Sequence, residues 1–217
     1  MRRAQLLPCL AFAAICAGPQ PAQADDATIW RGHFLVGKAG AQFNPCRTGE
    51  RFALVDATPG QALEAAYRAL ARRRGRAIFV EFAGQRTANG ITATRFERAL
   101  TDGPGCREEL QAVRLRAYGF NPFIQVEVRA TTVLLRLRPA SAPVAYAGAT
   151  LRVDGGEARL EAASAASVLH LRVRAKPCRE TLSNGLFSYE ATVDVGGVLY
   201  AACAYWGDLG PIPDLPR

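Results

Sequence analysis

Apolar residues recur at every second position through much of the chain, and this alternation constrains the fold more than any other feature. In residues 123–129, for example, Ile124, Val126 and Val128 alternate with polar side chains. A period of two places alternate side chains on opposite faces of a β-strand, with the apolar ones toward a core. Turns such as Gly196-Gly197 separate these runs. The sequence therefore predicts a mainly β protein.

The first half of the chain, residues 25–107, contains short strand-like runs around one helix. Three runs precede the helix and two follow it. They cover residues 30–37, 41–46, 51–57, 77–82 and 91–100. That order predicts an OB-like five-stranded barrel with one helix.

The helix has its own start and stop signals. Thr58 is a candidate N-cap, Pro59 takes the first helical position, and Gln61 stands where a capping-box partner belongs. Gly75 supplies the stop. The apolar stripe at helical spacing consists of Leu63, Ala66, Tyr67 and Leu70.

The second half, residues 108–210, shows strand patterns and no helical period of useful length. Strand-like runs cover residues 123–129, 132–138, 168–174, 189–195 and 198–205. In residues 132–138 the pattern turns Leu137 inward, with Val133 and Leu135. We expect an antiparallel β sandwich or barrel here. Residues 211–217 are rich in proline, and we expect a loose tail.

The first 24 residues have the pattern of a secretory signal peptide. Arg2 and Arg3 give a positive head, and an apolar run covers residues 6–17. Ala22-Gln23-Ala24 then offers a small-x-small cleavage site. Cleavage there leaves residues 25–217. A lipoprotein signal is the alternative, because Cys16 ends the apolar run.

The composition suits a globular exported protein. No segment after residue 24 is long and apolar enough for a transmembrane helix. The OB-like layout alone would suggest nucleic-acid binding, but for an exported chain we expect no nucleic-acid partner. We predict a secreted or periplasmic location.

Four cysteines remain after the signal peptide, an even number in an oxidising setting. Three connectivities are possible. We favour the two in which each pair lies inside one predicted domain, Cys46–Cys106 and Cys178–Cys203. The spacing lacks a CxxC pair and places no histidine near a cysteine, so structural disulfides are a better interpretation than a metal site.

Few residues could carry catalysis. His33 and His170 lie within predicted strands, and the sequence holds no recognisable nucleophile, metalloprotease, phosphate-loop or dinucleotide motif. Glu180 and Ser183 lie in the loop after Cys178, where polar residues commonly cap the backbone. We predict that the chain is not an enzyme and needs no cofactor.

Arginine is the conspicuous polar residue. One group follows the helix, and another lies on the outward positions of the second-half strands. Such groups can attract anionic envelope surfaces, although a solvated face explains them equally well. The candidate contacts are Arg72, Arg73, Arg74, Arg136, Arg138, Arg172 and Arg174.

The first half resembles the C-terminal OB domain of NlpE, a bacterial envelope lipoprotein linked to copper resistance and surface stress. The similarity lies in WRGHFLVGKAGAQFNPCRTGERFALVDA (residues 30–57), in ALEAAYRALARRRGRAIFVEFAGQ (residues 62–85) and in Cys106. Its distinctive points are a Phe-x-x-Cys-x-Thr-Gly turn and a Leu-Glu-x-Ala-Tyr helix. This resemblance implies an envelope protein without enzymatic activity.

The second half is similar to an uncharacterised family of bacterial envelope proteins. The matching positions are Asn121, Pro122, Phe123, Cys178, Ser183, Tyr189, Ala191, Val193, Cys203 and Ala204. Ile124 stands where the relatives have tryptophan, and residues 25–217 contain no methionine. Thioether sulfur is a preferred Cu(I) ligand, so its absence argues against copper binding.

These observations favour an exported, non-enzymatic binding or sensing module of the NlpE type. Its expected partner is an envelope protein or an anionic envelope surface. The alternative is a periplasmic metal-handling protein, for copper, that would use His33, His170 or reduced cysteines.

Overall fold

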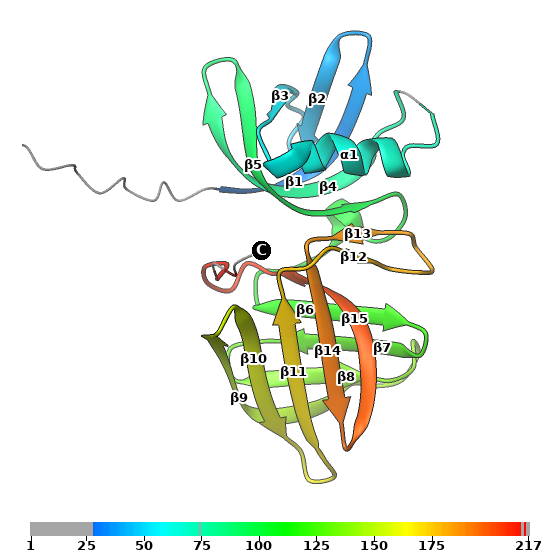
Figure 1. The fold of residues 1–217 in the computed structure, drawn as a ribbon, viewed down its shortest axis with the longest axis vertical. Helices are drawn as coiled ribbons and strands as arrows, with labels where there is room; N and C mark the ends of the chain where they lie inside the picture. The colour runs from blue at the N-terminus through cyan, green and yellow to red at the C-terminus, as the bar shows by residue number, and fades with distance from the viewer. Residues whose placement is uncertain (1–27, 74, 214, 216–217) are drawn as a thin grey trace, which may run out of the picture.

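The computed structural model describes residues 28–73, 75–213 and 215 and contains two β-barrels, one above the other in Figure 1. The predicted mainly β fold is confirmed, because a closed five-stranded barrel with a helix precedes an eight-stranded antiparallel barrel. The predicted signal peptide, residues 1–24 with Cys16, lies outside the described residues.

The first barrel has the strand order of an OB-fold, β1-β2-β3-β5-β4 with β4 pairing back to β1. Neighbouring strands are antiparallel except β3 and β5, which are parallel. The helix α1 (Ala62–Leu70) lies between β3 and β4 along the chain. The strands are β1 (Thr28–Gly37), β2 (Gly40–Pro45), β3 (Phe52–Asp56), β4 (Ile78–Thr87) and β5 (Gly90–Leu100).

Aromatic rings fill the core of this barrel. Phe43 and Phe82 meet edge to face with ring centroids 4.9 Å apart. Phe34 makes a similar contact with Tyr67 of α1 at 5.4 Å, which joins the helix to the sheet. Each of these side chains is buried.

The start of the helix differs from the prediction. Residues Pro59–Gln61 form a 3₁₀ turn, and the side chain of Thr58 caps no backbone group. Instead, the carboxylate of Asp56 accepts hydrogen bonds from the Thr58 amide at 3.0 Å and from the Glu64 amide at 2.8 Å. Asp56 therefore satisfies the free amides that a capping residue serves.

The second barrel is an up-and-down meander. Each strand pairs with the next one of the barrel along the chain, and β15 closes on β6. Leu137, predicted to face inward, lies beyond the end of β8 and is exposed. The strands are β6 (Leu115–Phe120), β7 (Phe123–Val128), β8 (Thr132–Arg136), β9 (Val144–Asp154), β10 (Glu157–Ala163), β11 (Val168–Arg174), β14 (Tyr189–Val195) and β15 (Val198–Trp206).

A short hairpin from the second half of the chain joins the first barrel. It consists of β12 (Cys178–Arg179) and β13 (Leu186–Phe187), and β13 pairs with β5. In Figure 1 this hairpin lies between the two barrels. The 3₁₀ turn η2 (Gly105–Arg107) follows β5 along the chain and lies in the same region.

We call the contact region between the barrels the junction. Both favoured disulfides, Cys46–Cys106 and Cys178–Cys203, are present there. Around them lies an apolar cluster of Phe79, Leu100, Leu110, Val113, Phe187, Cys203 and Tyr205. The disulfides therefore reinforce the region where the two barrels meet.

Ile212 and Leu215 pack against the second barrel, although the sequence predicted a loose tail over residues 211–217. Leu215 is buried within the barrel's apolar cluster, and Ile212 packs against the same cluster. Burial of these two side chains outweighs the lack of strand pairing in this proline-rich segment. Among the residues that the structure describes, no helix has the length and apolar character needed to cross a membrane.

Candidate ligand-binding face

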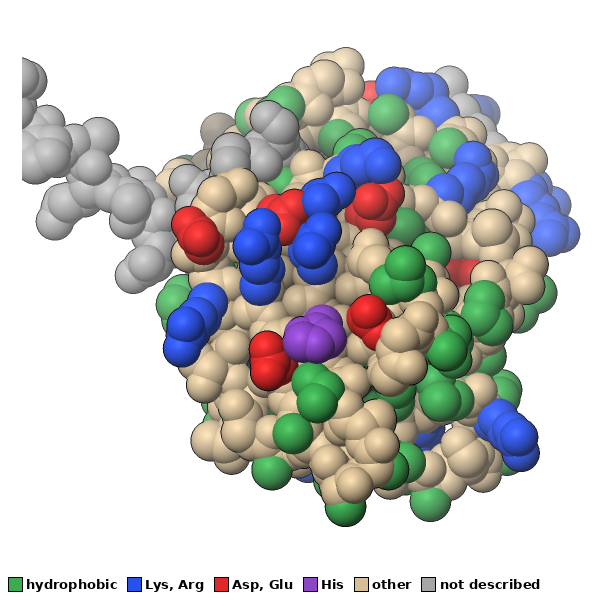
Figure 2. All heavy atoms as spheres, turned by 60° about the horizontal axis from the view of Figure 1, so that its bottom comes forward, with side chains coloured by type: hydrophobic (Ala, Val, Ile, Leu, Met, Phe, Trp, Pro, Cys, Tyr) green, Lys and Arg blue, Asp and Glu red, His purple; other side chains and the backbone are tan. Residues whose placement is uncertain are grey.

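The outer surface of the second barrel carries the most concentrated set of charged side chains near a depression. This open depression, of about 1060 Å³, lies over β9, β10, β11 and β14. Figure 2 shows this side of the molecule, with acidic side chains on both sides of a histidine and basic side chains gathered beside them.

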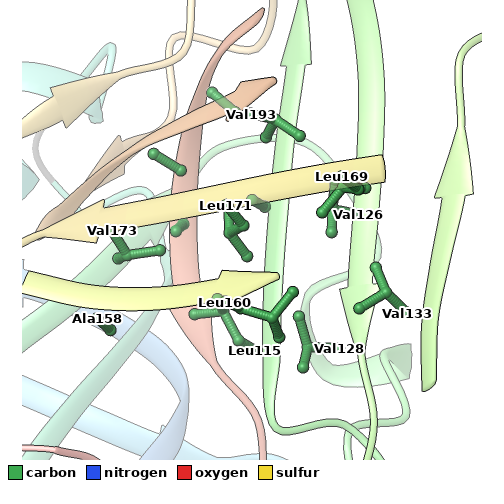
Figure 3. Close-up of a cluster of buried hydrophobic side chains, with 14 of the residues drawn as sticks. Leu115, Val126, Val128, Val133, Ala158, Leu160, Leu169, Leu171, Val173 and Val193 are labelled. Atoms are coloured by element: carbon green, nitrogen blue, oxygen red, sulfur yellow. The ribbon is translucent and has the colours of Figure 1, made fainter. Parts of the chain in front are cut away.

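Strand alternation explains why charged residues cover this surface. Leu160, Leu171 and Val173 point into the barrel, where they pack against residues from other strands (Figure 3). Their neighbours along the strands, Arg159 beside Leu160 and Arg172 between Leu171 and Val173, must then point outward. The packed interior thus provides a rigid support for the outer side chains.

Three arginines stand side by side on neighbouring strands. Arg159 of β10 pairs in register with Arg152 of β9 on one side and with Arg172 of β11 on the other. Cβ atoms of such cross-strand neighbours lie about 5 Å apart, so their like charges repel. We call Arg152, Arg159 and Arg172 the arginine row.

One carboxylate partly neutralises this row. Glu157 accepts a hydrogen bond from Arg159 Nε at 3.0 Å, and it forms ion pairs with Arg172, whose Nε lies 3.5 Å away, and with Arg174. The hydrogen bond from Arg174 is the largest cause of the lowered pKa of Glu157. Arg152 has no ion pair among the described residues.

A second row runs parallel to the first and differs in chemistry. His170 pairs in register with Glu161 and with Asp194, so these residues form a polar row across β10, β11 and β14. His170 Nδ1 lies 3.6 Å from Glu161 Oε2, and Asp194 Oδ1 accepts from the Gly197 amide at 2.8 Å. Two residues along a strand, about 7 Å, separate the polar row from the arginine row.

The structure divides the arginines predicted on the second-half strands. Arg172 and Arg174 lie on this face, but Arg136 ends β8 and Arg138 lies beyond it. Leu135, the neighbour of Arg136, pairs with the first residue of β9, whereas Arg152 lies near its last. Arg136 and Arg138 therefore lie toward the opposite end of the barrel from Arg152.

The remaining predicted arginines belong to the first barrel. Arg72 and Arg73 are exposed in the connection from α1 to β4, because the helix already ends at Leu70. Arg74 lies outside the described residues. Arg152 and Arg159 were not among the predicted contacts, since β9 and β10 were not predicted.

The two histidines are not brought together. His33 lies in β1, where its Nδ1 is 3.9 Å from Cys106 Sγ, whereas His170 is in the second barrel. The four predicted cysteines are bonded in pairs. Within residues 28–73, 75–213 and 215, no three His, Cys, Asp or Glu side chains are grouped so that they could hold a metal ion.

Glu180 and Ser183 organise their own loop. Glu180 Oε2 accepts from the Ser183 amide at 2.6 Å, from its hydroxyl at 2.8 Å and from the Leu182 amide at 3.0 Å. Burial alone would raise the pKa of Glu180, but these backbone hydrogen bonds lower it. The described residues show no bond from either side chain to His170. Their role in the loop is to cap the backbone.

A network of alternating charges crosses the junction. Arg98 donates to Glu81 at 2.7 Å through Nε and to Glu108 at 2.6 Å through Nη2. Glu108 also accepts from Arg116 and from the hydroxyl of Tyr205. The ion-paired side chains of this network are Arg31, Glu81, Arg98, Glu108, Arg116, Glu127, Arg129 and Asp208.

Pairing favours the charged forms of Arg98 and Glu108. Burial alone would lower the pKa of Arg98, but Glu81 and Glu108 raise it above its usual value. Burial would likewise raise the pKa of Glu108, but Arg98 and Arg116 lower it. The guanidinium of Arg98 also stacks over the Tyr205 ring, with its Cζ 3.7 Å from the ring centroid.

Comparison of the chain with protein-family models, curated proteins and solved structures found no match.

Proposed function

We propose that this chain is an exported, non-enzymatic binding protein of the bacterial cell envelope that holds an anionic envelope component on its arginine row. The observation that carries this proposal is the placement of Arg152, Arg159 and Arg172 on adjacent strands beside a depression. Adjacent like charges cost stability, and binding an anion removes that cost.

The arginine row has donors left for a ligand. A guanidinium presents its donors in a planar fork that fits phosphate and carboxylate groups. Glu157 occupies the Nε atoms of Arg159 and Arg172, and no bond of their Nη atoms exists among the described residues. Arg152 keeps all its donors. An anionic ligand would therefore meet several free N–H groups at once.

Export and the NlpE relationship belong to the same proposal. The signal-like first 24 residues and the two disulfides support export, because disulfides persist in oxidising compartments. The OB strand order and a helix between β3 and β4 are compatible with the NlpE-type domain. Metal handling, the alternative function, gains no support from the described residues, whose histidines lie on different barrels.

The binding test uses the exported protein and polyglutamate as a defined polyanion. Calorimetric titration at low salt should show binding, and Arg152→Gln with Arg159→Gln should weaken it about tenfold, which corresponds to about 1.4 kcal/mol. Added salt should weaken binding of the unchanged protein, since the contacts are exposed.

The matched control carries Arg73→Gln with Arg138→Gln, which makes the same change in net charge on other surfaces. This variant should bind as the unchanged protein does. Equal weakening by both double variants would mean that net charge, rather than the arginine row, attracts the polymer. Mass spectrometry of protein from its native cell tests export, with an N-terminus at Asp25 and two disulfides as the expected result.

A further inference from the structure

We infer that the ligand of this face is a sugar polymer that carries anionic groups, rather than a simple anion or a lipid surface. The inference rests on the proposed function and adds the class of ligand. It starts from the second set of side chains on the face, the polar row of Glu161, His170 and Asp194.

The polar row weakens the binding of ligands that offer only negative charge. Glu161 is largely exposed, and Asp194 is half-buried with one oxygen bonded to the Gly197 amide. A polyphosphate chain or a plane of lipid phosphates would cover both rows, since they lie about 7 Å apart. Its charges would then approach two carboxylates. A fitting ligand must present hydrogen-bond donors to the polar row and an anion to the arginine row.

The spacing within the polar row favours hydroxyl groups over a single cation. Glu161 and Asp194 lie on opposite sides of His170, one strand away from it on each side. Neighbouring strands are about 4.8 Å apart, so the two carboxylates do not converge on one point. An ammonium group or a metal ion would need such convergence. Distributed hydroxyl groups would not, because each can donate to a different acceptor.

Neutral polar groups extend the same surface. Thr150 and Thr192 also line the depression and can both donate and accept hydrogen bonds. Leu199, which is largely exposed, follows Asp194 in register at the edge of the polar row. It offers a small apolar surface for the CH groups of a sugar ring. The face therefore combines cationic, acidic, hydroxyl and apolar groups in a form suited to a charged glycan.

The test compares polymers that separate charge from hydroxyl content. Oligogalacturonate has carboxylates on sugar rings, polyglutamate of matched charge has carboxylates alone, and dextran has hydroxyls alone. Phosphorylated mannan tests phosphate as the anion in place of carboxylate. We expect either charged glycan to bind the exported protein at least about fivefold more tightly than polyglutamate, as one added hydrogen bond would give.

The variant Glu161→Ala should change the affinity for charged glycans and for polyglutamate in opposite directions. It should weaken charged-glycan binding about fivefold by removing a hydrogen-bond acceptor, while polyglutamate should bind as well or better because a repelling carboxylate is gone. Glu50→Ala, which removes an exposed carboxylate from the first barrel, is the matched control and should leave charged-glycan binding unchanged. Both residues are exposed, so folding should persist.

Three outcomes would overturn the inference. If polyglutamate binds as tightly as the charged glycans, the face is a general anion surface, and the proposed function survives without the sugar specificity. If vesicles containing phosphatidylglycerol bind more tightly than any glycan, the ligand is a lipid surface. If no polymer and no vesicle binds, the proposed function fails as well.

Discussion

Arginine occurs in two contrasting settings in this molecule, the junction and the outer face of the second barrel. At the junction Arg98 is fully enclosed, and its neighbours Glu81 and Glu108 match its charge. On the outer face Arg152 has no ion pair among the described residues, and Glu157 is shared by three other arginines. Arginine is thus fully paired with carboxylates at the junction and only partly paired on the outer face.

The difference follows from the cost of removing charge from water. A buried guanidinium must be paired, because an unpaired buried charge costs several kcal/mol, about 3–5 by substitution studies. An exposed guanidinium is solvated and needs no partner. The paired arginines therefore hold the two barrels together. The arginine row, by contrast, has too few carboxylate partners to stabilise the fold, which favours a role in binding.

The largest expected effect comes from breaking the junction network. Arg98→Met should lower the free energy of unfolding by about 3–5 kcal/mol, because Glu81 and Glu108 would lose their shared buried cation and keep only the less buried Arg31 and Arg116. Urea unfolding followed by tryptophan fluorescence measures this change. The exposed Arg138→Met serves as control, with an expected change within about 0.5 kcal/mol. Equal changes in the two variants would contradict the comparison.

Removal of a junction disulfide ranks next. Replacing Cys178 and Cys203 by serine should cost about 3–4 kcal/mol, since the bond closes a loop with a sequence separation of 25 residues. Replacing Cys46 and Cys106, with a separation of 60, should cost slightly more. The melting temperatures of the two variants, measured without reductant, test this order. A smaller loss for the longer loop would count against it.

Glu97 of β5 gives the junction region a pH dependence. It is buried and accepts from Arg95 Nε at 2.6 Å, while its Oε2 has no hydrogen bond in the described residues. Burial raises its pKa to about 7, with Arg95 and Tyr189 opposing and Glu81 assisting. In the unfolded chain the carboxyl group titrates near 4.5.

A raised pKa of this kind stabilises the fold at low pH, where the carboxyl group is protonated, and the contribution is lost as pH rises through about 7. Glu97→Gln should remove this loss, so the variant gains about 3 kcal/mol over the unchanged protein between pH 5 and pH 8. Unfolding free energies across that range measure the difference. Parallel pH profiles of unfolding free energy for the two proteins would contradict the prediction, because they would mean that folding does not raise the pKa of Glu97.

Much of the fold follows from local patterns in the sequence. The three-strand, one-helix, two-strand order predicted the first barrel, since an OB-fold has only one way to connect these elements. Strict alternation located β7 and β11, and the Gly196-Gly197 turn located β14. The hairpin β12–β13 could not be predicted, because its pairing with β5 joins segments far apart in sequence. Nor could the burial of Leu215, which depends on an apolar cluster formed by strands distant in sequence.

The sequence predicted only part of the candidate face. Arg172 was placed on an outward position because Leu171 and Val173 alternate with it. Arg152 and Arg159 were missed because residues 144–163 are rich in alanine and glycine, which weakens the apolar signal of a strand. Extending a hairpin outward from the Gly155-Gly156 dipeptide, a turn signal, would have aligned these two arginines.

The smallest predicted effect gives the sharpest test of the comparison between junction and outer-face arginines. Here removal of an arginine should raise the free energy of unfolding instead of lowering it. Arg152→Gln should raise the free energy of unfolding by about 0.2–0.5 kcal/mol at low salt, since it relieves repulsion from Arg159 and breaks no ion pair. Thermal melts in low and high salt test this, because screening should abolish the gain. Arg73→Gln, with no arginine opposite it in a sheet, should show no such gain. Stabilisation by Arg152→Gln together with weaker polyanion binding would identify a residue kept for binding at some cost in stability. A loss of stability would instead place Arg152 among the arginines that hold the fold.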